Sequence, residues 1–149
     1  MGKDIKSAIN EKLSELARKN LELQSECEKA NKRADSILDE ALCEFLTVLD
    51  TFERAEQYIE EHELDKDEDG SKAIKRLLNA KKKAMFVLEK YNVKKMVFEN
   101  NMSVPDWCSI TDTEPDSSRQ NGEIVSIEKN GYLRDDRLLR SAEVIIIKN

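Results

Sequence analysis

The stretch LSELARKNLELQSECEKANKRADSILDEA, residues 13–41, decides how the first part of the chain folds. Its apolar and small side chains recur at alternating steps of three and four residues, a heptad pattern sustained for about four repeats. The a positions are Leu13, Asn20, Cys27, Ala34 and Ala41, and the d positions are Leu16, Leu23, Ala30 and Ile37. Because a helix this polar owes its stability to packing, the narrow seam predicts a coiled coil with a second helix.

One polar residue lies inside this seam. Asn20 occupies an a position, where a buried asparagine fixes the register and number of strands at a cost in stability. The alternative is an asparagine on a frayed helix end. The seam therefore predicts a specific pairing of two stems rather than a strong one.

The apolar face widens after Ala41. A second row of leucines, at positions 38, 42, 46 and 49, runs beside the continuing seam, and such a broad stripe suits a helical bundle. Between Lys3 and about Glu61 there is neither proline nor glycine, so we predict one continuous helix and a homodimer built on it. The residues predicted to dimerise are Leu13, Leu16, Asn20, Leu23, Ile37, Phe45, Val48, Leu49 and Phe52.

A second helix is predicted from about Ser71 to Tyr91. The acidic stretch before it ends in Asp69-Gly70-Ser71, which has turn chemistry, and Ser71 is a suitable N-cap. Asn92 is a suitable stop. Residues 1–92 are thus expected to form a helical stem and dimerisation bundle.

The sequence pattern of residues 93–149 is typical of a small β domain. Strands are predicted near residues 93–98, 107–111, 123–127 and 142–148, the last containing Val144-Ile145-Ile146-Ile147. Asn130-Gly131 is a strong hairpin signal. The predicted fold class is α+β, with two helices per chain followed by a β head.

The composition argues against several classes of protein. Charged residues make up 38% and aromatic residues 5%, which suits solvated helices better than one thick core. The first thirty residues lack the apolar segment of a signal peptide, and no apolar run approaches membrane-spanning length. We therefore expect an intracellular protein without a membrane partner. The cysteines, Cys27, Cys43 and Cys108, have neither disulfide-framework nor metal-ligand spacing.

Enzymatic and metal sites have little support. His62 is the single histidine, and neither a nucleophile motif nor a phosphate-binding glycine loop occurs. Residues 65–70 match the opening of a calcium loop, but Arg76 stands where the bidentate glutamate belongs. We expect no catalysis, no metal and no cofactor.

The second helix is strongly basic. From Lys72 to Lys95 the sequence contains nine basic residues and only one acidic residue, Glu89. This surface is compatible with a nucleic-acid-binding dimer, although we find no aromatic residues interleaved on it. Packing beside the acidic first helix, or a charged protein partner, explains the same charges.

Two segments resemble the GrpE family of nucleotide exchange factors. The first, FLTVLDTFERA at residues 45–55, is similar to the family's L-L-P-V-x-D-x-L-[ED]-R-A. The second, GYLRDDRLLRSAEV at residues 131–144, is similar to its G-Y-x-L-x-x-R-x-[IL]-R-x-A-x-V signature. Thr47 replaces the usual proline, Cys108 stands where histidine is usual, and Arg134 stands where the signature is apolar.

The resemblance implies a function for the whole assembly. It implies a homodimer with paired stems and a central four-helix bundle, one β head of which binds the nucleotide-binding domain of a DnaK-type chaperone. The head would promote ADP release during protein folding and the heat-shock response, in a bacterial cytoplasm or in a mitochondrial or other organellar matrix. An alternative is a structural coiled-coil adaptor of the same fold without exchange activity.

The resemblance also implies roles for single residues of the head. Those implied to contact the chaperone are Pro105, Arg137 and Ile146. Gly131 is implied to permit the hairpin turn. Those implied to support the head are Tyr132, Arg140 and Ala142.

Overall fold

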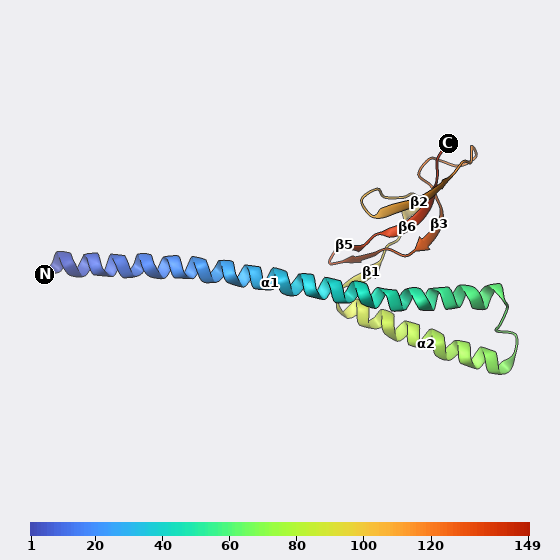
Figure 1. Ribbon diagram of the computed structural model, residues 1–149, viewed down its shortest axis with the longest axis horizontal. Coiled ribbons are helices and arrows are strands. Elements are labelled where there is room, and N and C mark those ends of the chain that lie inside the picture. The colour runs from blue at the N-terminus through green and yellow to red at the C-terminus, as the bar shows by residue number, and fades with distance from the viewer. The chain divides into compact units, whose positions relative to one another are not determined.

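A computed structural model describes all residues, 1–149, as two helices followed by two small sheets (Figure 1). This order confirms the α+β class predicted from the sequence. The elements are α1 Gly2–Glu61, α2 Glu68–Lys90, β1 Val93–Lys95, the short 3-10 helix η1 Glu99–Asn101, β2 Cys108–Glu114, β3 Ile124–Lys129, β4 Tyr132–Arg134, β5 Arg137–Arg140 and β6 Ala142–Ile147. The chain divides into two compact units, residues 1–41 and 42–149, which are described separately.

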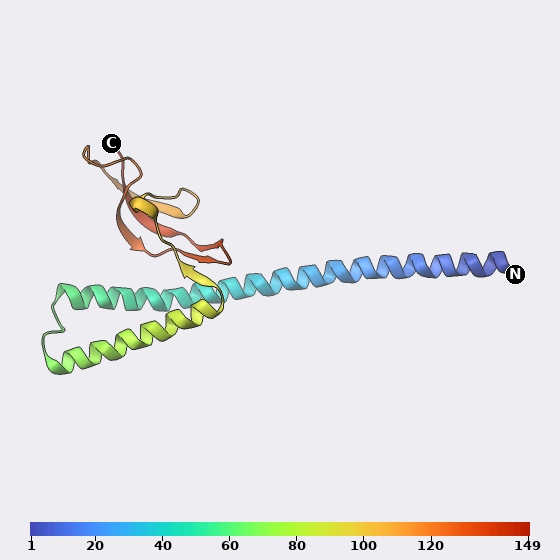
Figure 2. The same cartoon turned by 180° about the vertical axis from the view of Figure 1, so that it is seen from behind.

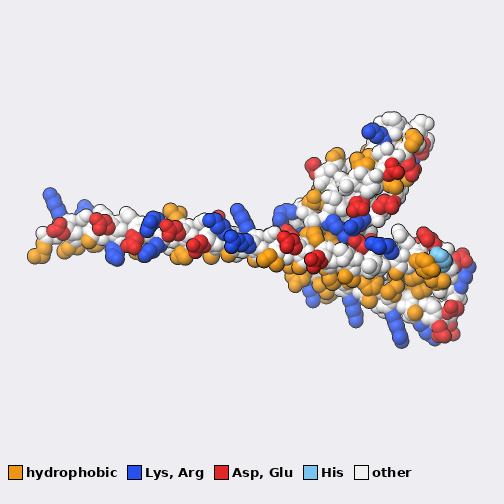
Figure 3. Space-filling view, viewed as in Figure 1, with side chains coloured by type: hydrophobic (Ala, Val, Ile, Leu, Met, Phe, Trp, Pro, Cys, Tyr) orange, Lys and Arg blue, Asp and Glu red, His pale blue; other side chains and the backbone are white.

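Residues 1–41 form the first part of α1 and carry the heptad seam. Its large apolar side chains are 57–66% exposed at Leu13, Leu16, Leu23 and Ile37. Figure 3 shows hydrophobic side chains spaced along this part of the helix. Ion pairs such as Lys19–Glu15, at 2.9 Å, link neighbouring turns but are worth only about 0.3–0.5 kcal/mol each. The chain itself therefore leaves the seam uncovered.

Within residues 42–149, α2 folds back along the second part of α1 (Figures 1 and 2). Leu42, Leu46, Leu49 and Leu88 are buried, and an ion pair joins Lys81 of α2 to Glu56 of α1. Leu49 was predicted to dimerise, but it is already 1% exposed inside one chain. The basic second helix thus packs partly against the acidic first one, as the charge pattern suggested.

The second helix begins earlier than the sequence suggested. Asp67 is the N-cap, and its side chain accepts a hydrogen bond of 2.5 Å from the Gly70 N–H. The predicted turn at residues 69–71 is wrong, because these residues lie in the first turns of α2. Aspartate caps as well as serine does, and acidic residues in the first turn favour the helix dipole. The helix ends as predicted before Asn92, which adopts a left-handed φ of 57°.

The head contains two three-stranded sheets, ordered β1-β4-β5 and β2-β6-β3. β2 pairs with β6 in parallel, whereas the other pairs are antiparallel. The core of the head is formed by Met96, Ile124, Ala142, Val144 and Ile146, with Trp107 packed against it. The clearest predicted strand, residues 142–148, is confirmed as the central strand β6.

The hairpin predicted at Asn130-Gly131 is wrong. These residues connect β3 to β4, which belong to different sheets. The tight turn lies between β4 and β5, where Asp135 and Asp136 have φ values of 49° and 60°. Both central residues of such a turn need positive φ, which aspartate tolerates better than most residues.

Gly131 is nevertheless required by the fold, for a different reason. Its φ is not positive, so it does not serve a left-handed turn. A Cβ placed there would lie 2.6 Å from the backbone nitrogen of Ala142 and would overlap the sulfur of Met96. The absence of a side chain therefore permits the link between β3 and β4 to pass close to β6.

Neither helix combines the length and the apolar content needed to cross a bilayer. The helices end at Lys90 and the strands begin at Val93, next to the predicted domain boundary at residue 92. The division into a stem with bundle and a separate β domain stays a prediction.

Candidate functional site

The two segments that resemble the GrpE family meet in the structure. Asp50, from the first segment, lies on α1, and Arg140, from the second, ends β5. The Arg140 guanidinium donates to both oxygens of the Asp50 carboxylate, at 2.8 and 2.7 Å. Asp50 is only 7% exposed. This forked geometry is the strongest form of a carboxylate–guanidinium contact.

Arg140 also binds the head on its other side. Its Nε and Nη2 donate to the Asn130 carbonyl at 3.2 and 2.8 Å, and its guanidinium carbon lies 5.4 Å from the centre of the Tyr132 ring. The ring face attracts the cation. A single guanidinium therefore joins α1, β4, β5 and the link between β3 and β4.

Further polar contacts surround this ion pair. Asn130 donates to the Glu53 carboxylate at 2.6 Å, and Lys95 of β1 lies 3.6 Å from the same group. The Cys43 thiol donates to the Leu139 carbonyl at 3.3 Å. Together with Asp50 and Arg140, these residues form what we call the junction of α1 with the head.

Tyr132 lies inside this junction and is almost fully buried. Burial raises its pKa to about 12, and the nearby negative charge of Glu53 acts in the same direction. Both effects disfavour the phenolate. The ring therefore stays neutral under ordinary conditions and serves as packing and as a face for the Arg140 cation.

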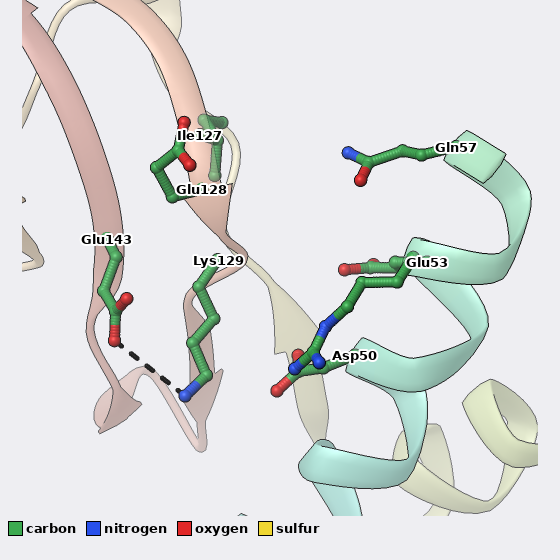
Figure 4. A pocket seen from close by; sticks show the side chains of 8 residues that line it. Asp50, Glu53, Gln57, Ile127, Glu128, Lys129 and Glu143 are labelled. Carbon is green, nitrogen blue, oxygen red and sulfur yellow. Dashed lines mark ion pairs between the residues drawn. The ribbon is translucent and has the colours of Figure 1, made fainter. Parts of the chain in front are cut away.

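A polar cleft of about 340 Å³ opens beside the junction (Figure 4). Asp50, Glu53, Arg54 and Gln57 of α1 form one wall. The opposite wall comes from β3 and β6 and consists of Ile127, Glu128, Lys129 and Glu143, with Lys129 paired to Glu143 at 3.8 Å.

The three residues predicted to contact a chaperone lie on three different elements of the head. Pro105 lies exposed in the turn before β2, and Arg137 lies exposed at the start of β5. Ile146 is 8% exposed and belongs to the core of the head. Burial argues against direct contact by Ile146, which instead supports β6 from inside.

The supporting roles predicted for four residues of the head stay predictions. Tyr132 and Ala142 are buried, and Arg140 and Gly131 lie at the junction and at its connecting link. Among the residues predicted to dimerise, Asn20 and Val48 are exposed, whereas Phe45 and Phe52 are partly covered.

Sequence reasoning missed the role of Asp50. The signal was present, because the leucine row at 38, 42 and 46 advances by four residues and its next member is Asp50. A carboxylate that continues a buried row needs a paired cation, since a buried charge without a partner is costly. The row therefore indicated that Asp50 has a basic partner elsewhere in the chain.

Phe86 was also missed, and the basic helix does carry an aromatic side chain on its surface. Phe86 is 58% exposed, and the Lys90 ammonium lies 4.9 Å from its ring centre.

Comparison with known proteins identifies the family of this chain. The family model for GrpE matches residues 2–148. The Protein GrpE of Halorhodospira halophila (strain DSM 244 / SL1) is 26% identical over 138 residues, which is 86% of this chain and 55% of that protein. The chain thus spans about half the length of this curated relative. Because the family match covers nearly the whole sequence, this chain belongs to the GrpE family.

Proposed function

We propose that this protein is a nucleotide exchange factor for a DnaK-type chaperone. The single observation that carries the proposal is the GrpE family match over residues 2–148. The factor binds the nucleotide-binding domain better in its open state than in its closed state, and so shifts the population toward ADP release. The site of action is a bacterial cytoplasm or an organellar matrix.

The head supplies the contact surface in this proposal. Arg137 is exposed on β5 and offers a forked, permanently charged donor to a carboxylate of the chaperone. Pro105 offers a rigid apolar contact from the turn before β2. No bond is made or broken by the factor, so the protein is not an enzyme and needs no cofactor.

We further propose that the chain acts as a homodimer. The uncovered seam of residues 13–41 pairs with the same seam of a second copy. The apolar side chains that α1 and α2 leave exposed, including Val48 and Tyr58, then pack into a four-helix bundle. Figure 3 shows hydrophobic side chains gathered over this helical pair, which supports a buried partner face.

The exchange function is tested by the release of labelled ADP from the DnaK-type chaperone of the same organism. Wild-type protein accelerates the release, and Arg137→Ala weakens the acceleration roughly tenfold or more, since a hydrogen bond to a charged group is worth about 1.5–3 kcal/mol. Arg76→Ala is the matched control, because it removes an exposed arginine from α2 and leaves the head intact.

Two outcomes contradict the leading proposal. Absence of acceleration by the wild-type protein rejects exchange activity. Binding to the chaperone without faster ADP release instead supports the structural adaptor of the same fold.

Nucleic-acid binding remains the second candidate because of the surface of α2. Lys72, Lys75, Arg76, Lys82 and Lys83 are exposed along α2, and the exposed ring of Phe86 lies beside the Lys90 ammonium on the same helix. Cations beside an aromatic ring suit a nucleic-acid strand. Tight duplex or single-strand binding with a steep salt dependence supports this function, and no binding at low salt dismisses it.

If the protein is a homodimer, mild oxidation should form a disulfide between the stems of the two copies. If two stems pair in parallel and in register, the Cys27 residues of the two copies face each other at an a position. Mild oxidation with diamide is expected to convert most of the protein into a covalent dimer on a non-reducing gel. Cys27→Ser abolishes this product, although Cys43 and Cys108 remain.

The control places the thiol on the outside of the same helix. Ser25 lies at an f position, away from the seam. Ser25→Cys in the Cys27→Ser background is expected to cross-link poorly. Equal cross-linking from residues 25 and 27 argues against the parallel seam.

A further inference from the structure

We propose that the Asp50–Arg140 pair is a positioning device that holds the head at one fixed orientation on the helices. The inference rests on the proposed exchange function, since it assigns these two residues the task of presenting the contact surface to the chaperone. Neither residue touches the chaperone in this scheme. They act through Arg137, which shares strand β5 with Arg140.

The described polar contacts fasten the head along one side. The Glu53 carboxylate of α1 accepts a hydrogen bond from Asn130 and forms an ion pair with Lys95, and the Asp50 carboxylate accepts hydrogen bonds from Arg140. These partners belong to the sheet β1-β4-β5 and to the link that enters it. On the side of β3 and β6, the polar cleft separates the head from α1 (Figure 4). A domain that is held by polar contacts along one edge can tilt about that edge, unless one of the contacts fixes its angle.

The charges on the two walls of the cleft offer alternative partners. Arg54 on the helical wall faces a wall that carries Glu128 and Glu143. Lys129 on the head wall faces one that carries Glu53. A head tilted into the cleft would gain such pairs, so the amino-acid composition of the cleft does not itself favour the open arrangement.

The Asp50–Arg140 pair is suited to fix the angle because its geometry is narrow. Two parallel hydrogen bonds of 2.7 and 2.8 Å define both the distance and the plane of the two groups. A buried ion pair contributes little net stability compared with apolar residues, and its attested value is in selecting one arrangement. We therefore assign it to orientation rather than to the stability of the fold.

The orientation set at Arg140 also sets the position of Arg137, because both residues belong to the short strand β5. Arg137 and Arg140 are the first and last residues of β5, and both are paired with β4, opposite Arg134 and Tyr132. A change of angle at Arg140 therefore displaces Arg137. Because binding groups must be placed within about 0.5 Å of their productive positions, a tilted head loses contact energy.

The test replaces both members of the pair by apolar residues of similar size. Asp50→Leu/Arg140→Met leaves no buried charge behind, so the fold is kept. Full-length protein carries spin labels at Gln57→Cys and Glu128→Cys, on opposite walls of the cleft, with Cys27, Cys43 and Cys108 changed to serine. Labelled chains are diluted into unlabelled ones, and distance distributions are measured together with ADP release. Glu68→Leu/Lys72→Met, which removes an exposed ion pair of 2.8 Å in the same way, is the matched control.

The expected result is a narrow distance distribution in the wild type and the control, and a broad or shifted one in Asp50→Leu/Arg140→Met. ADP release by that variant falls roughly tenfold or more. Emission of Trp107, which packs against the core of the head, stays unchanged, and this separates positioning from unfolding. If the double variant fails to fold, Arg140→Lys is measured in its place. It keeps the charge but loses the two-pronged geometry of the guanidinium, so a distribution of intermediate width is expected.

An unchanged distribution together with wild-type ADP release overturns the inference. If the wild-type protein does not accelerate ADP release at all, the proposed function fails. In that case the widths of the distributions still decide whether the pair orients the head.

Discussion

Replacing Gly131 by alanine is expected to destabilise the head by about 3 kcal/mol, at the upper end of the usual cost of overpacking. The added Cβ would lie 2.6 Å from the Ala142 nitrogen and 3.0 Å from the Ala142 Cβ. Ala142 is fully buried in the central strand β6, so these atoms cannot retreat without disturbing the sheet. Denaturant unfolding followed by Trp107 emission measures the loss.

Gly122→Ala provides the contrast for this prediction. Gly122 has a φ of 85°, which alanine adopts only at a cost of about 1–2 kcal/mol, but its nearest neighbours lie at 3.6 Å. The Gly131 variant should therefore be the less stable of the two. The opposite ranking would show that the residues around Gly131 move to accommodate a Cβ, and that the close approach to β6 does not require glycine.

Gly131 also shows where local sequence reasoning failed. The dipeptide Asn130-Gly131 has the composition of a tight hairpin turn, and the sequence around it allows one. The strands on its two sides are drawn into different sheets, because β3 pairs with β6 and β4 pairs with β1 and β5. Pairing between distant strands thus overrides a local turn signal, and the tight turn forms at Asp135-Asp136 instead.

The helices could be predicted with more success because their signals are local. The seam and the leucine row repeat over many turns, and the structure confirms a helix that ends at Glu61. The start of α2 was missed by a few residues, since Asp67 and Ser71 are both good caps and only the folded chain selects one.

The parallel pairing of β2 with β6 was beyond prediction from the sequence. It joins residues 108–114 to residues 142–147 across three intervening strands. β2 is mostly exposed and has no alternation of polar and apolar residues that would fix its partner. The junction was partly predictable, since Asp50 interrupts a buried leucine row, but nothing local identified Arg140 as its partner.

Removing Asp50 alone is expected to destabilise the fold strongly. Asp50→Ala leaves the Arg140 guanidinium beside Tyr132 and the Asn130 carbonyl without its carboxylate, in a site where Asp50 itself is 7% exposed. Breaking a buried pair in this way costs about 3–5 kcal/mol. Thermal and denaturant unfolding, followed by circular dichroism and Trp107 emission, measure the loss.

A double-mutant cycle separates this cost from the worth of the pair itself. Asp50→Leu and Arg140→Met are each expected to be strongly destabilising, whereas the two together restore stability to within about 1–2 kcal/mol of the wild type, because no unpaired charge stays buried. Glu22→Ala, which breaks an exposed pair with Arg18 at 3.9 Å, should cost less than about 1 kcal/mol. A cost for Asp50→Ala as small as that of Glu22→Ala would mean that water reaches the junction and screens it. The pair could then no longer define the angle of the head, because a solvated ion pair tolerates many geometries while a buried fork tolerates one.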